Sequence, residues 1–556
     1  MNIHPFTVAV MLKDGRKYNE ICDHAVTAET IARKYREYSE LDFYACRIDH
    51  RTASLQEAID HACALELLDI RDVSAYRIYE ASLSFVYMRA VQHLYGNHVQ
   101  VRFPNSLSSG TYTLIRAEMD ADAAEKITAE IQRIVDADLP FERRVVNLEE
   151  MEQFLEEKRA NNDLKLVKSA PDLNQALLYT FDGVTELCFH EMVPSTGYLQ
   201  YFGVERYRNG FILRYPRPKS PQALPELNVR KKLYQAFAEN SGWRRIIGID
   251  CAADLNEAIE NGRIKEVIQL AEAVQERKIV EIATDIIHTG KRFVMIAGPS
   301  SSGKTTFAKR LCIQLRVLGA KPLYLGTDDY FVERTETPVD EEGKKDYETI
   351  DALDHELFNT QMEALLKGEK VDLPRFDFQN GTKVFGERIA SVGLDEPIVI
   401  EGIHGLNPRM SEGVDEAEKY RIYISPLTQL NIDDHNRISV SDVRMLRRIV
   451  RDYQFRGYSA AKTIEAWPSV RTGEEKHIFP YTDQADVFFN SHMLYELGAL
   501  KNVCEKLLQE IKPQDPSYAE AQRLLDFLKF FRKLDDLYPV PNNSILREFI
   551  GGSIIL

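Results

Sequence analysis

The stretch Gly298 to Thr306, GPSSSGKTT, has the residue types and spacing that hold a phosphate. It matches the pattern G-x-x-x-x-G-K-[ST], in which backbone N–H groups surround the phosphates, the lysine reaches the outer phosphates and the hydroxyl binds Mg²⁺. Lys304 and Thr305 take these two roles. The remaining cradle residues are Gly298, Pro299, Ser300, Ser301, Ser302, Gly303 and Thr306. The sequence therefore predicts a triphosphate site, with an ordinary glycine and serine turn as the alternative.

Phosphoryl transfer also needs a base, a carboxylate for a metal ion and cations for the developing charge. Asp328, in the run TDDYF, is the candidate base, and Glu401, at the end of an apolar run, is a candidate metal ligand. The cations are arginines spaced mostly by three or four residues: Arg444, Arg447, Arg448, Arg451 and Arg456. The alternatives are that the acids cap a helix and a turn, and that the arginines form a solvated face.

These residues need strands and helices to bring them together. The apolar run Phe293 to Ala297 predicts a buried strand before the loop, and the apolar spacing after the loop predicts a helix. Short apolar runs separated by helical segments recur to about residue 500, which is typical of a parallel sheet covered by helices on both faces. Such a sheet binds ligands at the carboxyl ends of its strands, where Asp328 and Glu401 fall.

The whole chain has 556 residues, too many for one hydrophobic core. We expect an α/β protein in which the sheet domain follows a small mixed module and an α+β domain. The proline-rich loop 215–225 is the clearest boundary. The expected divisions are 1–70 for a compact β-grasp module, 71–225 for the α+β domain, 226–285 for a helical connector, 286–500 for the sheet domain and 501–556 for a helical tail.

Composition limits the partners and the compartment. With 70 basic and 86 acidic residues the net charge is -16, which argues against broad adhesion to nucleic acid or anionic membrane. Seven scattered cysteines suggest no disulfide framework, and no apolar run has membrane-spanning length, so a cytoplasmic location is expected. One basic and aromatic stretch can contact RNA, although a solvated face is favoured; its cations are Arg206, Arg208, Arg214, Arg217 and Lys219.

Residues 286 to about 500 resemble the uridine kinase and phosphoribulokinase family of P-loop kinases. The resemblance lies in GPSSSGKTT, in TDDYF, in IVIEGIHGL and in the lid pattern R-x-x-R-D-x-x-x-R-G that runs from Arg448 to Gly457. It implies ATP and Mg²⁺ as cofactors, with Asp328 as base and metal neighbour. It also implies that Thr305 and Glu401 hold the metal. The transferred phosphoryl would then be neutralised by Lys304, Arg448, Arg451 and Arg456.

The acceptor blocks of that family match less closely. Glu348 stands where a ribose-binding Asp is expected, and Phe376 replaces a tyrosine but keeps the ring. The resemblance implies that these two residues and Arg448 contact the acceptor. Gly381 and Ala466 fall where uridine kinases have a base-reading His and a Gln, so these two groups of the uracil site do not carry over.

Residues 1 to about 225 resemble the amino-terminal region of threonyl-tRNA synthetases. Residues 1–70 look like its TGS β-grasp module, and residues 71–225 look like its editing domain through ELCFH at 186–190 and VPSTG at 193–197. The region that carries a histidine pair in those enzymes falls on 80–85, which has no histidine. We therefore interpret Cys188 and His190 as structural.

The leading hypothesis is an ATP-dependent, Mg²⁺-requiring kinase that phosphorylates a hydroxyl of a uridine- or cytidine-like nucleoside or a related small polyol. The alternative is a regulatory or RNA-associated protein that binds nucleotide without small-molecule kinase activity. The sequence leaves the acceptor and the oligomeric state open.

Overall fold

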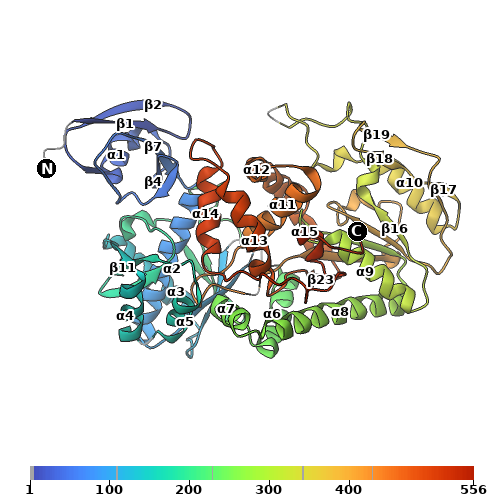
Figure 1. Cartoon of the computed structure of the whole chain (residues 1–556), viewed down its shortest axis with the longest axis horizontal. Coiled ribbons are helices and arrows are strands. Elements are labelled where there is room, and N and C mark those ends of the chain that lie inside the picture. Colours follow the sequence, from blue (N-terminus) through green and yellow to red (C-terminus); the bar gives the residue numbers. More distant parts are fainter. Residues whose placement is uncertain (1–4, 108–109, 159, 228–229, 341–342, 429) are drawn as a thin grey trace.

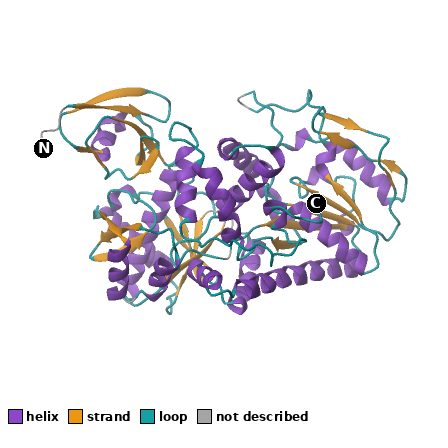
Figure 2. Ribbon diagram, in the orientation of Figure 1, coloured by secondary structure: helices purple, strands orange, loops and turns teal. Residues whose placement is uncertain are grey.

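The computed structural model describes residues 5–107, 110–158, 160–227, 230–340, 343–428 and 430–556. The N-terminal module lies at one end of the molecule and the parallel sheet at the other, with the C-terminal helices between them (Figure 1). Strands gather in separate sheets that helices surround (Figure 2). The expected α/β class is confirmed, since a P-loop strand-and-helix unit sits in a parallel sheet.

The N-terminal module is a mixed five-stranded sheet of order β2-β1-β7-β4-β5 with helix α1 packed on it. Its central strands β1 and β7 run parallel, and the outer pairs are antiparallel. Val8, Val10, Leu65 and Leu67 are at most 1% exposed and alternate with less buried residues, as expected for strands with one buried face. The elements are β1 (Phe6–Met11), β2 (Lys17–Cys22), α1 (Ala28–Tyr35), β4 (Phe43–Ile48), β5 (Arg51–Ala53) and β7 (Cys63–Asp69), with the short pair β3 (Val26–Thr27) and β6 (Ala58–Ile59).

The next part combines two antiparallel sheets with helices α2 to α5. The long helix α2 supplies much of its core, where Tyr79, Leu83 and Val86 are fully buried against α3. The sheets have the orders β13-β14-β9-β8 and β10-β11-β12. The elements are α2 (Val73–Tyr95), β8 (Val101–Leu107), β9 (Gly110–Ile115), α3 (Ala123–Asp136), β10 (Glu142–Asn147), α4 (Leu148–Lys158), α5 (Asn161–Ser169), β11 (Gln175–Phe181), β12 (Val184–Cys188), β13 (Gly203–Tyr207) and β14 (Gly210–Arg214).

The expected helical connector is present as α6 (Lys231–Ile247), α7 (Ala252–Glu260) and α8 (Ile264–Thr289). Helix α8 runs along the edge of the molecule up to the first strand of the parallel sheet (Figure 1). It ends at Gly290, whose φ of +67° is the left-handed conformation that glycine adopts at low cost. The chain then enters the P-loop strand.

The parallel sheet has the order β16-β21-β15-β22-β23. Alternate residues of β15 enter different cores: Val294 and Ile296 face α8 and α9, and Phe293 and Met295 face the side that carries α10. Burial on both faces explains the continuous apolar run. The elements are β15 (Phe293–Ala297), α9 (Lys304–Val317), β16 (Leu323–Gly326), α10 (His355–Leu366), β17 (Val371–Asp372), β18 (Arg375–Asp377), β19 (Thr382–Val384), β20 (Ile389–Ala390), β21 (Ile398–Gly402), β22 (Lys419–Ser425), α11 (Val440–Arg456), α12 (Ala460–His477) and β23 (Val487–Asn490).

The expected helical tail is helical only in part. It contains α13 (Glu496–Gln509), α14 (Tyr518–Leu528) and the short α15 (Arg547–Ile550), while residues 529–546 form no helix. Pro539 and Pro541 lie in this stretch, and proline interrupts helices because it lacks an N–H and clashes with the preceding turn. The non-helical stretch leads α15 back to the phosphate loop.

None of the described helices combines the length and apolar character needed to span a bilayer. All seven cysteines are free thiols. The expected domain boundaries stay predictions.

Candidate functional site

The phosphate loop joins β15 to α9 at the carboxyl edge of the parallel sheet. Ser301 and Gly303 adopt positive φ values of 59° and 85°, which fold the loop back so that its N–H groups can converge. Gly298 has no room for a side chain, because a Cβ there would lie 2.1 Å from the carbonyl oxygen of Ile424. The hydroxyls of Ser301 and Ser302 are buried without a hydrogen-bond partner in the described part of the chain. A loop with unpaired donors of this kind fits an anionic ligand.

Lys304 begins α9 and folds over the loop. Its Nζ donates a hydrogen bond to the Pro299 carbonyl at 3.2 Å. Burial lowers the pKa of Lys304, while the nearby carboxylates of Glu401 and Asp328 oppose this shift. The ammonium is therefore held between the loop and two acids, where it can reach the outer phosphates of a nucleotide.

Thr305 and Glu401 meet where α9 faces the end of β21. The Thr305 hydroxyl donates to Glu401 Oε1 at 2.9 Å, and the Tyr324 hydroxyl donates to the same oxygen at 3.2 Å. Burial raises the pKa of Glu401, and the charge of Asp328 raises it further. A hydroxyl and a carboxylate of this kind fit Mg²⁺, which takes oxygen ligands. The described residues contain no group of three or more His, Cys, Asp or Glu side chains that could hold a metal ion by themselves. A Mg²⁺ ion held partly by phosphates needs no such group.

Asp328 and Asp329 follow β16 but have different surroundings. Asp329 is engaged by the protein: Arg388 donates to it at 3.1 Å and the Phe376 N–H at 3.3 Å. The Asp328 side chain opens toward solvent, yet protein atoms crowd around it, and this loss of hydration raises its pKa against the pull of Lys304. Asp328 is therefore the member of the pair available to an incoming hydroxyl.

Helix α11 brings arginines to the phosphate loop. Arg448 donates to the Ser300 hydroxyl at 3.0 Å and to Asp452 at 3.2 Å. Arg451 lies 3.7 Å from Asp452, and its Nε is buried without a hydrogen-bond partner among the described residues. Arg456, at the end of the helix, is exposed and pairs with Asp452 at 3.2 Å. The three predicted lid arginines thus share one carboxylate beside the loop.

Arg444 and Arg447 differ from the other arginines of α11, because both are at most 1% exposed. Arg444 forms a bidentate ion pair with Glu474 and donates to the Ser300 carbonyl at 2.9 Å. Arg447 pairs with Glu496 and donates to the Ser491 carbonyl at 2.8 Å. The alternative of a solvated arginine face therefore does not hold for these two residues, which brace the loop from inside.

The predicted acceptor residues lie around the same edge. Burial and then the charge of Glu474 raise the pKa of Glu348 to about 7, while Arg448 and Lys304 pull it down, so Glu348 lies close to the cations of the site. Phe376 packs against Phe331, with ring centroids 5.7 Å apart. The Phe376 N–H donates to Asp329, which ties this segment to the residue that follows the candidate base.

The two positions where uridine kinases have a base-reading His and a Gln, and Trp467 beside the second, do not present recognition groups to the acceptor. Arg334 covers Gly381, and a Cβ at that glycine would lie 2.6 Å from Arg334 Cβ. Ala466 is exposed. Trp467 is buried beneath the Arg444 guanidinium, at 5.2 Å, and donates to the Ser441 hydroxyl at 3.2 Å.

Sequence reasoning missed the contact between the phosphate loop and the C-terminal tail. The Glu548 carboxylate accepts a hydrogen bond from the Thr306 hydroxyl at 2.8 Å. No motif signals this contact, since 242 positions separate the two residues and Glu548 lies beyond the region that resembles a kinase. The end of the chain also contacts α9, where Lys309 donates to the Ile555 carbonyl at 3.0 Å, while the Ile554 side chain is exposed.

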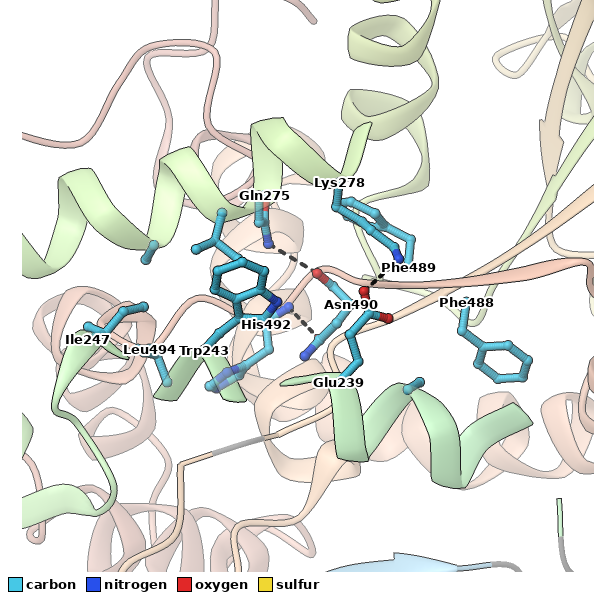
Figure 3. Close-up of a pocket in the computed structure, with 13 residues that line it drawn as sticks. Glu239, Trp243, Ile247, Gln275, Lys278, Phe488, Phe489, Asn490, His492 and Leu494 are labelled. Carbon is cyan, nitrogen blue, oxygen red and sulfur yellow. Dashed lines mark hydrogen bonds and ion pairs between the residues drawn. The ribbon is translucent and has the colours of Figure 1, made fainter. Parts of the chain in front are cut away.

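A separate pocket lies between α6, α8 and the end of β23, as Figure 3 shows, and it contains none of the predicted site residues. Its lining includes Trp243, Gln275, Lys278 and His492. Both ring nitrogens of His492 are buried without a hydrogen-bond partner in the described chain. The adjacent Ser491 joins this region to Arg447 and the phosphate loop.

The candidate groups of the N-terminal part are Cys188 and the cations proposed for RNA. Burial raises the pKa of the Cys188 thiol, which suits a structural residue more than a nucleophile. The cations proposed for RNA are largely engaged within the protein. Arg206 donates to the Asp120 carbonyl, Arg214 pairs with Glu205, Lys219 pairs with Glu475, and Arg217 stacks on Tyr215.

Comparison with known proteins supports both halves of this description. A sequence model of the Phosphoribulokinase / Uridine kinase family matches residues 293–495. Uridine kinase from Halobacterium salinarum is 28% identical over 193 residues, which cover 34% of this chain and 76% of that protein. Uridine kinase from Ligilactobacillus salivarius is 30% identical over 194 residues, or 34% of this chain and 81% of that protein. The N-terminal part matches threonine–tRNA ligase from Symbiobacterium thermophilum, 27% identical over 159 residues, which are 28% of this chain and 24% of that ligase.

Proposed function

The chain belongs to the phosphoribulokinase / uridine kinase family through residues 293–495, and on that premise we propose that it transfers the γ-phosphate of ATP to a hydroxyl of a nucleoside or related small polyol. The main support for this proposal is that a cation, a candidate base and a hydroxyl–carboxylate pair suited to a metal ion lie together at one edge of the sheet. Lys304, Asp328 and the Thr305–Glu401 pair lie there within mutual electrostatic reach. This set meets the needs of phosphoryl transfer.

Each residue has a distinct task in the proposed reaction. Asp328 takes the proton of the accepting hydroxyl, and its raised pKa brings it closer to the value that suits a base near neutral pH. Lys304 and Arg448 stabilise negative charge that develops on the transferred group. Thr305 and Glu401 would hold Mg²⁺, which would supply further neutralisation of the phosphate charge.

The acceptor is proposed to lie between Glu348, Phe376 and Arg448. A carboxylate beside cations can accept hydrogen bonds from two neighbouring hydroxyls, and the Phe376 ring offers a flat apolar surface. This chain has Gly381, covered by Arg334, where uridine kinases have a base-reading histidine. The proposed acceptor is therefore a hydroxyl-bearing nucleoside or polyol whose base is not specified.

The test is acceptor-stimulated production of ADP. Purified full-length chain is incubated with Mg²⁺ and ATP, and a panel of nucleosides, pentoses and polyols is added singly. We expect at least one compound to raise the rate of ADP release well above the rate without acceptor, and Lys304→Ala to remove that increase. Lys321→Ala, at an exposed lysine beyond α9, is the matched control. Slow ATP hydrolysis that no acceptor stimulates would instead favour a regulatory nucleotide-binding protein.

A further inference from the structure

The C-terminal segment 544–550 lies directly on the phosphate loop. Ile545 fills the space above Gly303, where a Cβ would lie 2.4 Å from its Cγ2 atom. Phe549 packs under the Arg447 guanidinium, 4.9 Å from the ring centroid. Both apolar side chains are fully buried, so the segment is a packed part of the site.

Glu548 places a carboxylate at the start of the phosphate-binding helix. Its Oε2 atom accepts from the Thr306 hydroxyl at 2.8 Å and from the Thr306 N–H at 3.4 Å. Thr306 is in the first turn of α9, where N–H groups have no partner within the helix and serve as phosphate donors in this kind of loop. Glu548 is only 7% exposed, so its contact with Thr306 lies in the interior of the protein. A carboxylate here uses donors that a phosphate would use.

The charge of Glu548 reaches the groups that surround the triphosphate site. Burial lowers the pKa values of Lys304 and Arg451, and the negative charge of Glu548 opposes both shifts. The same charge adds to the pKa of Glu401, which burial raises. Glu548 therefore interacts with the same cations that a triphosphate would, and its charge has the same sign as that of any incoming phosphate. A carboxylate and a triphosphate held together here would repel each other in a poorly hydrated site.

We propose that segment 544–550 is a built-in competitor of the nucleotide, with Glu548 standing in for a phosphate until ATP displaces it. This inference rests on the nucleotide binding in the proposed function. Contacts on either side of Glu548 would keep the displaced segment close: Arg547 donates to the Leu537 and Val540 carbonyls, both at 2.8 Å, and Lys309 donates to the Ile555 carbonyl. A tethered competitor acts at a high effective concentration.

A different role predicts the opposite result. If Glu548 only held the loop in shape for the nucleotide, its loss would weaken ATP binding, and ATP would make the segment more rigid. Competition predicts tighter binding without Glu548 and a looser segment with ATP. The sign of each change therefore decides between the two roles.

Equilibrium binding of Mg²⁺–ATP without acceptor tests this on the full chain, by calorimetry of wild type, Glu548→Gln and Glu510→Gln. Glu510 is exposed at the end of α13 and serves as the matched control. We expect Glu548→Gln to bind ATP about tenfold more tightly, since a hydrogen bond to a charged group contributes roughly that much, and Glu510→Gln to match wild type. Equal or weaker binding by Glu548→Gln overturns the proposal and leaves nucleotide binding intact. If neither wild type nor the variant binds, nucleotide binding itself fails and the inference with it.

Hydrogen exchange on the wild-type chain gives a readout that needs no variant. Addition of Mg²⁺–ATP should slow exchange in the phosphate loop at 298–306 and speed it in 544–551. Slower exchange in both segments would overturn the proposal, because segment 544–550 would then be stabilised by the nucleotide.

For the calorimetry, an unchanged thermal transition checks that Glu548→Gln folds properly.

Discussion

The Thr305 hydroxyl donates a hydrogen bond of 2.9 Å to Glu401, although 96 positions separate the two residues. Parallel pairing of β15 with β21 creates this contact, because Ala297 pairs with Gly402 and so both strands end at the same edge. Tyr324, from the neighbouring strand β16, binds the same carboxylate. The strands β15, β16 and β21 together thus position the Thr305–Glu401 pair that we assign to the metal ion.

The Mg²⁺ requirement should depend on Glu401. We expect Glu401→Gln to raise the Mg²⁺ concentration for half-maximal turnover by about tenfold or more, as loss of a positioned ligand does. Titration of Mg²⁺ at constant ATP measures this. Tyr324→Phe removes a neighbour of the carboxylate but leaves it in place, and it should stay near the wild-type value. An unchanged Mg²⁺ dependence in Glu401→Gln would argue against the metal assignment.

Asp328 and Asp329 should respond differently to the same substitution. Asp328→Asn is expected to lower kcat by about 10²–10⁴-fold, the usual contribution of a general base, with little loss of ATP binding. Asp329→Asn disturbs contacts with Arg388 and the Phe376 backbone, so it should mainly lower thermal stability and raise the acceptor KM. Steady-state kinetics with thermal melting separates the two outcomes. If Asp329→Asn proved the more damaging to kcat, the base would have been assigned to the wrong residue.

The arginines of α11 should divide into two groups. Arg444→Ala removes the bidentate partner of the buried Glu474 and leaves it only the contact with Arg471 at 3.0 Å. Breaking a buried ion pair costs up to about 3–5 kcal/mol, so the urea unfolding midpoint should shift downward. Arg448→Ala removes a partly exposed group beside Ser300, so it should slow turnover while leaving that midpoint nearly unchanged. Stability loss of equal size in both variants would contradict this division.

Stability should depend on pH through Glu348. Its pKa is about 7 in the folded protein, above the ordinary value of 4.5, chiefly because it is buried. Between these two values the folded state binds more protons than the unfolded state, so the contribution of Glu348 to stability falls as pH rises through this window. Glu348→Gln removes this titration and should gain stability relative to wild type between pH 5 and pH 8, by at most about 3 kcal/mol.

Urea unfolding of wild type and Glu348→Gln at both pH values measures that difference. Glu412→Gln, at an exposed glutamate, should show the same pH dependence as wild type. A difference between Glu348→Gln and wild type that stays constant with pH would mean that Glu348 does not titrate in this range.

Local motifs and strand periodicity explain why much of the site could be predicted. The apolar run before Gly298 defines β15, and a second run that ends at Glu401 defines β21. Once both strands are parallel, their carboxyl ends must meet. The family resemblance added Glu348 and Phe376, whose positions near Arg448 and Asp329 the structure then supplies.

Other features could not be read from the sequence, because they depend on distant partners. Helical spacing groups Arg444 and Arg447 with the lid, but their burial is set by Glu474 and Glu496, which lie on other helices. The tail shows the same limit. Apolar spacing predicts α14, whereas only the folded chain reveals that α15 brings Glu548 to Thr306.

The fate of the γ-phosphate decides whether the chain is a small-molecule kinase. Phosphorus NMR of the full chain with Mg²⁺, ATP and each acceptor that stimulates ADP release follows this phosphate through the reaction. We expect a phosphomonoester signal on the acceptor to replace the γ-phosphate signal of ATP, and Lys304→Ala and Asp328→Asn to suppress this replacement. Release of inorganic phosphate alone, with no phosphomonoester for any nucleoside or polyol, would contradict this prediction.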